Sequence, residues 1–420
     1  MDTRSLVQTV LSGNDRPFGV RLWNGTEIPP LHAASVPVVV VANERGAEAF
    51  LPPSEERLAD AFLAGDIDVE GDLVDFIERA SSWSGPEYLP TTALAAGLVA
   101  EVGARASQLL RSASRHTIAR DDASVRHHYD VGNDFYRLFL DEQMVYSCAY
   151  WAEGADRLDL AQVAKLELIC RKLGLRPGQR FLDVGCGWGA LIAHATHVHG
   201  VRATGISLSD AQLEVARERM LSVLPAGTTP DLRHQDYRLL PPNERWDAMA
   251  SVGMMEHVGR EHLDRYFSSL VRHLAPGALL LNHAISETGS ALKTIPWLQR
   301  THGGFIKHQI FPDSDLPPLD LVIAAAQRNG FEVLDVEAFR PFYARTLVEW
   351  LGRLERRFPE AVQLVGKRRA RAWRLYFAST AVTFRSGRTT VAQVLLQKRE
   401  GGAPRVLDKA GWYRDLATRG

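Results

Sequence analysis

Cysteine is scarce in this chain. Only three of its 420 residues are cysteines, and Cys148, Cys170 and Cys186 are an odd, widely spaced set that matches neither a disulfide framework nor a metal-ligand motif. We therefore expect a protein of a reducing compartment, with no structural disulfide and no metal site.

A long apolar segment and a net charge are also missing. The longest apolar runs, such as residues 93–100, are far shorter than the roughly 20 residues that a membrane-spanning helix needs, and no secretory signal is evident. The 50 acidic and 49 basic side chains nearly cancel, which argues against nucleic acid as a partner. We expect a cytoplasmic protein that contacts a membrane at most peripherally, at its inner face.

Helical and strand patterns alternate over most of the chain. Two short strands and two helices predict a small mixed α+β domain at 1–85, and an Ala/Leu-rich, basic stretch predicts a helical linker at 86–124. Residues 125–420 predict a second domain, in which crossover helices join parallel strands. Its fold class is α/β, a doubly wound, mostly parallel, Rossmann-like sheet. The strands are expected at 180–184, 202–206, 231–234, 246–251 and 278–285, with helices at 159–173, 189–199, 209–222 and 261–274.

A glycine-rich turn, FLDVGCGWGA (181–190), follows the first of these strands. Gly185, Gly187 and Gly189 allow a ligand to approach the main chain closely, at the sheet edge where doubly wound folds bind their ligands. The spacing differs from the GxGxxG of dinucleotide sites, and the Walker lysine of phosphate loops is missing. Asp183, just before the turn, favours a ligand site over a purely structural turn.

Seven further segments accompany this turn. Together they cover about residues 125–400, and with LDVGCGWGA they resemble the cyclopropane-fatty-acyl-phospholipid synthase and mycolic acid cyclopropane synthase family of class I S-adenosylmethionine-dependent methyltransferases. Leu239, Met255 and Phe342 depart from the family's usual residues. The segments are HHYDVGNDFYRLFLDEQMVYSCAYW (127–151), TGISLSDAQ (204–212), SVGMMEHVG (251–259), NHAI (282–285), FIKHQIFPDSDLPPL (305–319), FYARTLVEW (342–350) and FRSGRTTVAQVLLQK (384–398).

The resemblance implies an S-adenosylmethionine site built from several of these segments. Asp183 and the three glycines would meet the methionine and ribose portions of the cofactor, and three residues of the first segment would close over its amino-acid end. Others would follow the ribose and the adenine. By resemblance the closing residues are Tyr129, Tyr146 and Ser147, the ribose residues Ser207, Leu208 and Gln212, and the adenine residues Gln235 and Asp236.

The resemblance also implies a catalytic set around a bound bicarbonate ion. Cys148 and Ile285 would contact the ion through backbone groups, and the side chains of Glu256, His283 and Tyr343 would hold it. Among these, only His283 is also indicated by position, because a polar residue near the carboxyl end of an apolar strand points toward the ligand site. Cys148 is expected to be a small buried thiol without a nucleophile's role.

The implied substrates are membrane phospholipid acyl chains with a cis double bond. We expect a lid insertion at 288–319, and basic stretches at 353–358 and 366–374 are either a contact for anionic head groups or a solvated helix face. The product is a cyclopropane or, alternatively, a methylene or methyl-branched chain. Methylation of another small or lipid acceptor, a lipid-binding protein without catalysis, and a homodimer also stay open.

Overall fold

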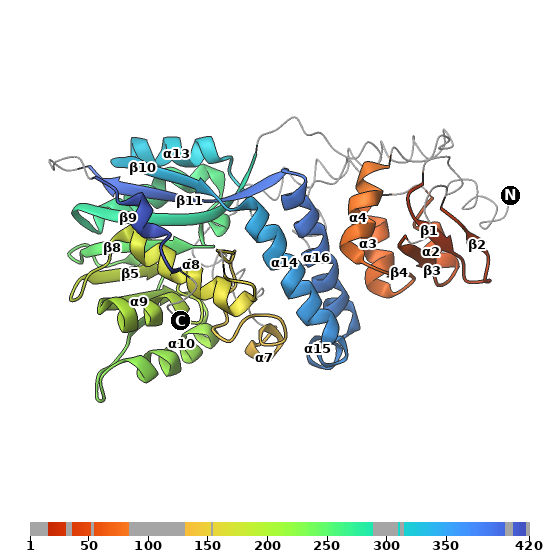
Figure 1. Cartoon of the computed structure of the whole chain (residues 1–420), viewed down its shortest axis with the longest axis horizontal. Coiled ribbons are helices and arrows are strands. Elements are labelled where there is room, and N and C mark those ends of the chain that lie inside the picture. Colours follow the sequence, from red (N-terminus) through yellow and green to blue (C-terminus); the bar gives the residue numbers. More distant parts are fainter. Residues whose placement is uncertain are drawn as a thin grey trace. The chain divides into compact units, whose positions relative to one another are not determined.

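The computed structural model describes residues 16–30, 36–51, 54–83, 131–152, 154–288, 310, 315–399 and 406–416. It contains two compact units (Figure 1). Residues 16–83 and 354–383 belong to the first unit, and most of the remaining described residues form the second. The predicted linker at 86–124, most of the predicted lid and Tyr129 lie outside the described residues.

The first unit contains a four-stranded mixed sheet in the order β2-β1-β3-β4. β1 and β3 are parallel, and the other pairs are antiparallel. Apolar side chains on the sheet pack against the helices, with Phe18 and Trp83 in edge-to-face contact. The elements are β1 (Gly19–Arg21), β2 (Glu27–Ile28), β3 (Val38–Val41), α2 (Glu44–Glu48), α3 (Glu55–Ala64), β4 (Ile67–Glu70) and α4 (Leu73–Ser82).

Helix boundaries in this unit follow local capping. Ser54 accepts a hydrogen bond from the Arg57 N–H at the start of α3, and Asp72 accepts two from the first turn of α4. Gly65 ends α3 with φ 85°, a conformation that favours glycine. Local capping therefore sets the start of both helices and the end of α3.

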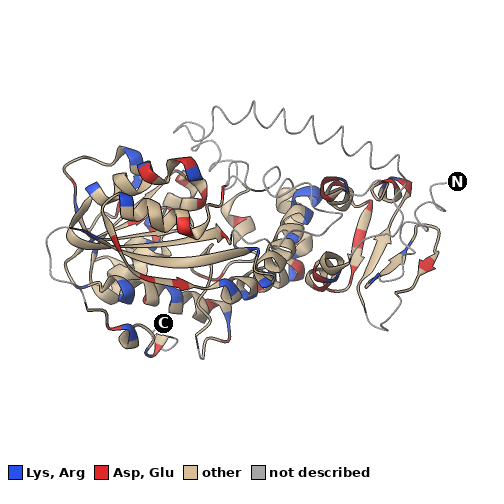
Figure 2. Ribbon diagram, turned by 90° about the horizontal axis from the view of Figure 1, so that it is seen from above, with Lys and Arg blue, Asp and Glu red and all other residues tan. Residues whose placement is uncertain are grey.

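The basic stretch at 366–374 makes its main contacts inside the first unit. Arg371, only 4% exposed, donates to the carbonyls of Phe62 and Ile67 and pairs with Asp68. Arg368 pairs with Asp60, and Arg374 with Glu355 and Asp68. Three of the five basic side chains of this stretch thus bind acidic or carbonyl groups of the same unit. Basic and acidic residues also alternate over both units (Figure 2).

The second unit contains a seven-stranded sheet in the order β10-β11-β9-β8-β5-β6-β7, which confirms the predicted α/β class. β5 to β9 are parallel, and β11 pairs antiparallel with both β9 and β10. The strands are β5 (Arg180–Val184), β6 (Arg202–Ser207), β7 (Asp231–His234), β8 (Trp246–Val252), β9 (Leu274–Glu287), β10 (Phe331–Ala338) and β11 (Thr389–Lys398).

Parallel neighbouring strands need crossover connections, which are right-handed in nearly all proteins. The chain runs outward from β5 through β6 to β7 and then returns to β8 and β9, so the α9 and α10 crossovers cover the face opposite to α11. The helices of this unit are α7 (Asn133–Tyr136), α8 (Leu158–Leu173), α9 (Ala190–His199), α10 (Asp210–Val223), α11 (Leu263–Arg272), α13 (Leu319–Arg328), most of α14 (Arg340–Arg356) and α17 (Lys409–Trp412), with short 3-10 turns η1 (Tyr237–Leu239), η2 (Met255–His257) and η3 (Arg260–His262). Two further helices, α15 (Phe358–Val365) and most of α16 (Lys367–Arg385), belong to the first unit.

The order in which the chain adds strands to the sheet reverses between β5 and β8, which are parallel neighbours. In open α/β sheets a ligand binds outside the carboxyl ends of the strands at such a point. The glycine-rich turn follows β5 directly, so the fold places it at this position. Within the described residues no helix is both long and apolar enough to cross a membrane.

Candidate active site

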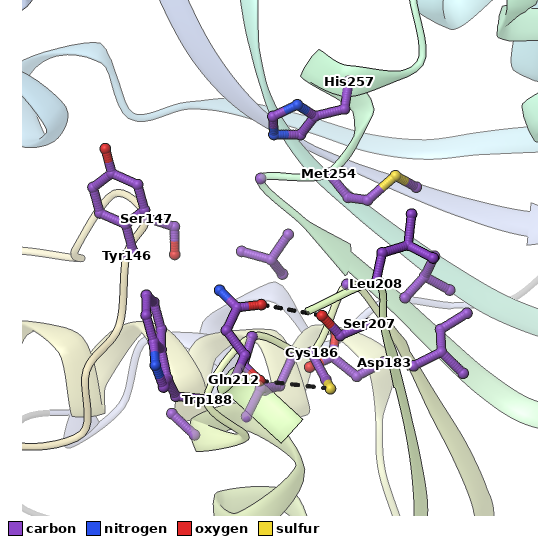
Figure 3. Close-up of a pocket in the computed structure, with 18 of the residues that line it drawn as sticks. Tyr146, Ser147, Asp183, Cys186, Trp188, Ser207, Leu208, Gln212, Met254 and His257 are labelled. Atoms are coloured by element: carbon purple, nitrogen blue, oxygen red, sulfur yellow. Dashed lines mark hydrogen bonds between the residues drawn. The ribbon is translucent and has the colours of Figure 1, made fainter. Parts of the chain in front are cut away.

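A cavity of about 160 Å³ lies at the carboxyl ends of β5, β6 and β8. Figure 3 shows Tyr146, Ser147 and Trp188 along one side of it and Leu208 and Met254 along the other, with the Gln212 amide between them. Ten residues predicted to bind the cofactor line this cavity: Tyr146, Ser147, Asp183, Gly185, Gly187, Ser207, Leu208, Gln212, Gln235 and Asp236.

The three glycines of the turn have different surroundings, although all have positive φ. A Cβ at Gly187, with φ 52°, would meet no atom within 4 Å, and one at Gly185 would meet Met254 at 3.1 Å. Gly189 does not line the cavity. Its Cβ would lie 2.9 Å from that of Ala216, so Gly189 allows α9 to pack against α10. Gly185 and Gly187 face the ligand space, whereas Gly189 serves helix packing.

Ser207, at the end of β6, fixes the side-chain amide of Gln212 in α10. The Ser207 hydroxyl donates to Gln212 Oε1 at 3.1 Å and accepts from the Ser209 N–H. This bond leaves the Gln212 NH₂ group directed at the middle of the cavity (Figure 3). The side chain therefore offers hydrogen-bond donors to a ligand.

The two residues that are predicted to lie near the adenine already have hydrogen-bond partners in the protein. Asp236 forms an ion pair with Arg238 at 2.6 Å and caps η1. The Gln235 amide donates to the Leu239 carbonyl at 2.8 Å. Both residues line the cavity. Because their side chains are bonded to other protein groups, they shape the cavity wall.

A buried lysine stands behind the turn. Lys165 of α8 lines the cavity and donates to Ser147 Oγ at 3.0 Å. Burial lowers the pKa of Lys165 to about 8, against the attraction of Asp141 and Asp183. Burial raises the pKa of Asp183 to about 7, an effect that Lys165 opposes. In this low-dielectric environment the Lys165 ammonium group favours the ionised form of Asp183, and the Asp183 carboxylate favours the protonated form of Lys165.

Glu256 and Ile285 are in direct contact. Glu256 Oε1 accepts from the Ile285 N–H at 2.8 Å, while Oε2 is buried without a hydrogen-bond partner among the described residues. Burial raises the pKa of Glu256 to about 7. The Ile285 N–H, expected to contact an anion, is thus used by Glu256, whose second oxygen stays available.

His283 is a buried neutral imidazole. Burial is the main cause that lowers its pKa to about 3, and Gln393 Nε2 lies 3.2 Å from its Nδ1. With Nδ1 accepting this bond, the ring proton is on Nε2. His283 Nε2 is buried and has no partner among the residues that the structure describes, so it offers a donor.

Cys148 and Tyr343 contact the same phenylalanine as His283. His283 and Phe339 stack with centroids 6.1 Å apart, Cys148 Sγ lies 3.9 Å from the Phe339 carbonyl oxygen, and the Tyr343 N–H donates to that oxygen. Burial raises the pKa of the Cys148 thiol far above its usual range, so the thiol stays protonated, as the sequence analysis expects.

Glu256, Cys148 and His283 adjoin residues that line the cavity. Glu256 lies between the lining residues Met254 and His257, and Cys148 follows the lining residue Ser147. The Gly253 N–H donates to the His283 carbonyl at 2.9 Å, which ties β9 to the rim. None of the five predicted catalytic residues lines the cavity itself.

The family model described as mycolic acid cyclopropane synthetase matches residues 116–394. The chain belongs to this family. A probable fatty acid methyltransferase of Pseudomonas putida is 36% identical over 384 residues, covering 91% of this chain and 92% of that protein. The cyclopropane-fatty-acyl-phospholipid synthase of Escherichia coli K12 is 36% identical over 273 residues, 65% of this chain and 67% of that protein.

A solved structure in the family shares the fold. A mycolic acid cyclopropane synthase complexed with SAH and CTAB is 33% identical, with a TM-score of 0.62, and the match covers 66% of this chain and 98% of that one. The resemblance to this family and the predicted α/β fold class are confirmed. This mycolic acid cyclopropane synthetase homologue is an S-adenosylmethionine-dependent methyltransferase.

The cavity of this family member fits that cofactor. Asp183 Oδ1 is buried without a hydrogen-bond partner among the described residues, as expected of a carboxyl group that accepts a hydrogen bond from a bound ligand. Beside it, the main chain at Gly187 has open space where any other residue would place a Cβ. The main chain and the carboxyl group thus face one space.

Among the cavity residues that the sequence did not indicate are Lys165, Trp188, Met254 and His257. Lys165 lies three residues after Gln162 on one face of α8, and only the structure shows that both side chains are buried. Trp188 belongs to the glycine turn itself, where its Nε1 donates to Asn133 at 2.8 Å. For Met254 and His257 the sequence offered only their proximity to Glu256.

Proposed function

We propose that this chain methylates the cis double bond of unsaturated phospholipid acyl chains and closes a cyclopropane ring, with bound bicarbonate as the base. The observation that carries the proposal is a pair of buried atoms behind the cofactor cavity, Glu256 Oε2 and His283 Nε2, neither of which has a hydrogen-bond partner among the described residues. A small oxyanion would provide acceptors for both.

The cofactor residues would act by binding and orientation. When bound, S-adenosylmethionine supplies an electrophilic methyl group, whose transfer to the alkene leaves a carbocation on the acyl chain and a proton to be lost. Asp183, Gly185 and Gly187 would hold the methionine and ribose portions, and the Gln212 amide would donate to the ribose. Tyr146 and Trp188 border the cavity, and their ring faces suit a cation.

No residue of the catalytic set is a strong base in this environment. His283, with a pKa of about 3, takes up a proton poorly, and the Cys148 thiol stays protonated because burial raises its pKa. Glu256, with a pKa of about 7, can carry a proton on Oε2. Glu256 and His283 therefore suit the role of donors that hold an anionic base, and Tyr343 would complete this set.

The proposed substrate is a phospholipid of the inner face of the membrane. Support comes from the Escherichia coli relative, which is a cyclopropane-fatty-acyl-phospholipid synthase. Peripheral contact would rely on residues other than Arg368, Arg371 and Arg374, because these have acidic or carbonyl partners within the first unit. A cytoplasmic location follows from the same proposal.

The Pseudomonas putida relative, a probable fatty acid methyltransferase, keeps the alternative product open. Loss of a proton from a neighbouring chain carbon, instead of the transferred methyl, would give a methyl-branched chain that keeps a double bond. This alternative uses the same cofactor site and differs only in where the base acts.

Deuterium labelling distinguishes these outcomes. The purified full chain would be incubated with trideuteromethyl-labelled S-adenosylmethionine and phosphatidylglycerol vesicles with cis-monounsaturated chains, and saturated vesicles would be the control. Cyclopropane formation leaves two deuterium atoms in the lipid, and proton NMR of unlabelled product shows ring protons upfield of the alkyl signals. Retention of three deuterium atoms indicates the branched product, and an exocyclic methylene gives olefinic protons instead. Unlabelled lipid, despite cofactor binding by calorimetry, would exclude an acyl acceptor.

Bicarbonate removal tests the base. In carbonate-free buffer under argon we expect a reduced kcat that returns when bicarbonate is added, with little change in cofactor affinity. A kcat that is independent of bicarbonate would refute this part of the proposal and leave the methyl transfer standing.

A further inference from the structure

A second cluster of chemically active side chains lies between α8 and α9. Glu167 and Cys170 stand three residues apart in α8, on one helix face, and His194 and His199 come from α9. Glu167 Oε2 lies 2.9 Å from the Nε2 atoms of both histidines. Ligand atoms of Cys170, His194 and His199 lie within 4.8 Å of one another.

The cluster is enclosed and already organised. Cys170 is completely buried, and the side chains of Glu167, His194 and His199 are 1%, 7% and 16% exposed. Arg171 Nε donates to Glu167 Oε1 at 2.6 Å, which fixes the carboxylate and leaves Oε2 toward the histidines. Burial acts to raise the pKa of Glu167, but the hydrogen bonds from His194, His199 and Arg171 outweigh it and hold this pKa well below its usual range.

We propose that Glu167, Cys170, His194 and His199 form a binding site for a zinc ion that joins α8 to α9. These four side chains offer one sulfur, two nitrogens and one oxygen, which is a donor set typical of tetrahedral zinc. Soft thiolate with imidazole favours zinc over magnesium or calcium. Arg171 would remain on the second carboxylate oxygen and orient this ligand, as outer partners of zinc ligands do.

The distances are close to those that zinc requires. Bonds of about 2.0–2.1 Å to nitrogen and oxygen in a tetrahedron place neighbouring donors about 3.3 Å apart, and a bond of about 2.3 Å to sulfur places the sulfur about 3.6 Å from them. The carboxylate and imidazole atoms, at 2.9 Å, need to separate slightly. The Cys170 sulfur, within 4.8 Å of the histidine atoms, needs to approach them by at most about 1.2 Å. Glu167 is not part of this group of three, so its carboxylate also needs to turn toward the sulfur; side-chain rotation supplies both movements.

Zinc binding would displace protons from the cluster to solvent. The Cys170 thiol would lose its proton, and each histidine would bind through an Nε2 that carries no hydrogen. The ion would be structural, since four protein ligands fill a tetrahedral shell. Its position would stabilise the packing of α8, which carries Lys165, against the helix that follows the glycine turn.

Sequence spacing hides this site, because the two pairs of ligands are 24 residues apart or more and neither forms a familiar motif. The sequence analysis accordingly expects no metal site. Only the packing of α8 on α9 brings the pairs together.

Cobalt substitution tests the proposal on the full chain. After treatment with a chelator, the protein would be titrated with cobalt(II), and we expect one equivalent per chain and a near-ultraviolet charge-transfer band of a thiolate ligand. Cys170→Ser should abolish the band, and His199→Ala should weaken binding more than about tenfold, since even outer-shell changes cost 10–100-fold. His197→Ala is the matched control, because His197 is an exposed residue of the same helix outside the cluster, and it should retain band and affinity.

A thermal measurement covers the case in which Cys170→Ser does not fold. Zinc should raise the Tm of the wild-type chain and of His197→Ala but not that of His199→Ala, whose site is partly exposed, and magnesium should have no effect. A charge-transfer band that persists in Cys170→Ser would overturn the proposal. So would a wild-type chain that binds no cobalt and whose Tm is insensitive to zinc, which would identify the cluster as a hydrogen-bonded contact between helices only.

Discussion

Replacement of Glu256 by glutamine should change how the stability of the second unit depends on pH. Burial raises the pKa of Glu256 from its ordinary 4.5 to about 7 in the folded chain, and no charged side chain contributes to this shift. A carboxyl group whose pKa is raised by folding stabilises the fold below its unfolded pKa, and this stabilisation is lost as the pH rises through the folded pKa.

The magnitude follows from the size of the shift. The 2.5 units between 4.5 and about 7 correspond to about 3.4 kcal/mol at 1.36 kcal/mol per unit. About 2.5 kcal/mol of this falls between pH 5 and pH 8. Glutamine keeps an oxygen for the Ile285 N–H, which Glu256 binds at 2.8 Å, and does not ionise, so Glu256→Gln should lack this loss.

Urea unfolding at pH 5 and pH 8 measures the effect. The free energy of unfolding of Glu256→Gln minus that of the wild type should be about 2.5 kcal/mol larger at pH 8 than at pH 5, so the variant gains relative stability. Glu261→Gln, at an exposed position of the same segment, is the control and should follow the wild type at both pH values. An equal difference between Glu256→Gln and wild type at the two pH values would refute the reasoning.

Three further predictions concern other parts of the structure. Lys165→Met should lower the affinity for S-adenosylmethionine, measured by calorimetry, at least about tenfold, because a buried carboxyl group then lacks its cationic neighbour; unchanged affinity would contradict this. Gly189→Ala should reduce stability by about 3 kcal/mol through a clash at positive φ, whereas Gly187→Ala, at an open position, should weaken cofactor binding with a smaller loss of about 1 kcal/mol. Arg371→Ala should destabilise the first unit in urea by about 2 kcal/mol because it leaves the buried carbonyl groups of Phe62 and Ile67 without this donor, while the exposed Arg369→Ala should stay within about 0.5 kcal/mol of wild type.

Two layers meet at the carboxyl edge of the sheet. The cavity is bordered by main chain, amide and aromatic groups, and the proposed catalytic set includes the protonated Cys148 thiol and the neutral His283. Lys165 interacts electrostatically with both layers, since its charge acts on Asp183 and also on His283. A buried ammonium group at this border would favour an anion on the catalytic side.

Much of the architecture is determined by the sequence alone. The alternation of strand and helix patterns predicted β5 and β7 with their observed ends and α8 to within one residue, because strands and helices have distinct local patterns. The glycine turn and Asp183 likewise indicated a ligand site before any contact was known.

Tertiary structure decided the rest, because side-chain partners far apart in sequence depend on strand order and helix packing. The sequence analysis did not anticipate β10 and β11, whose antiparallel pairing places Gln393 beside His283. Nor does spacing distinguish Gly189, which contacts a helix, from Gly187, which faces open space. The bond between Glu256 and Ile285, and the meeting of Glu167 with two histidines of α9, exist only because separate segments pack together.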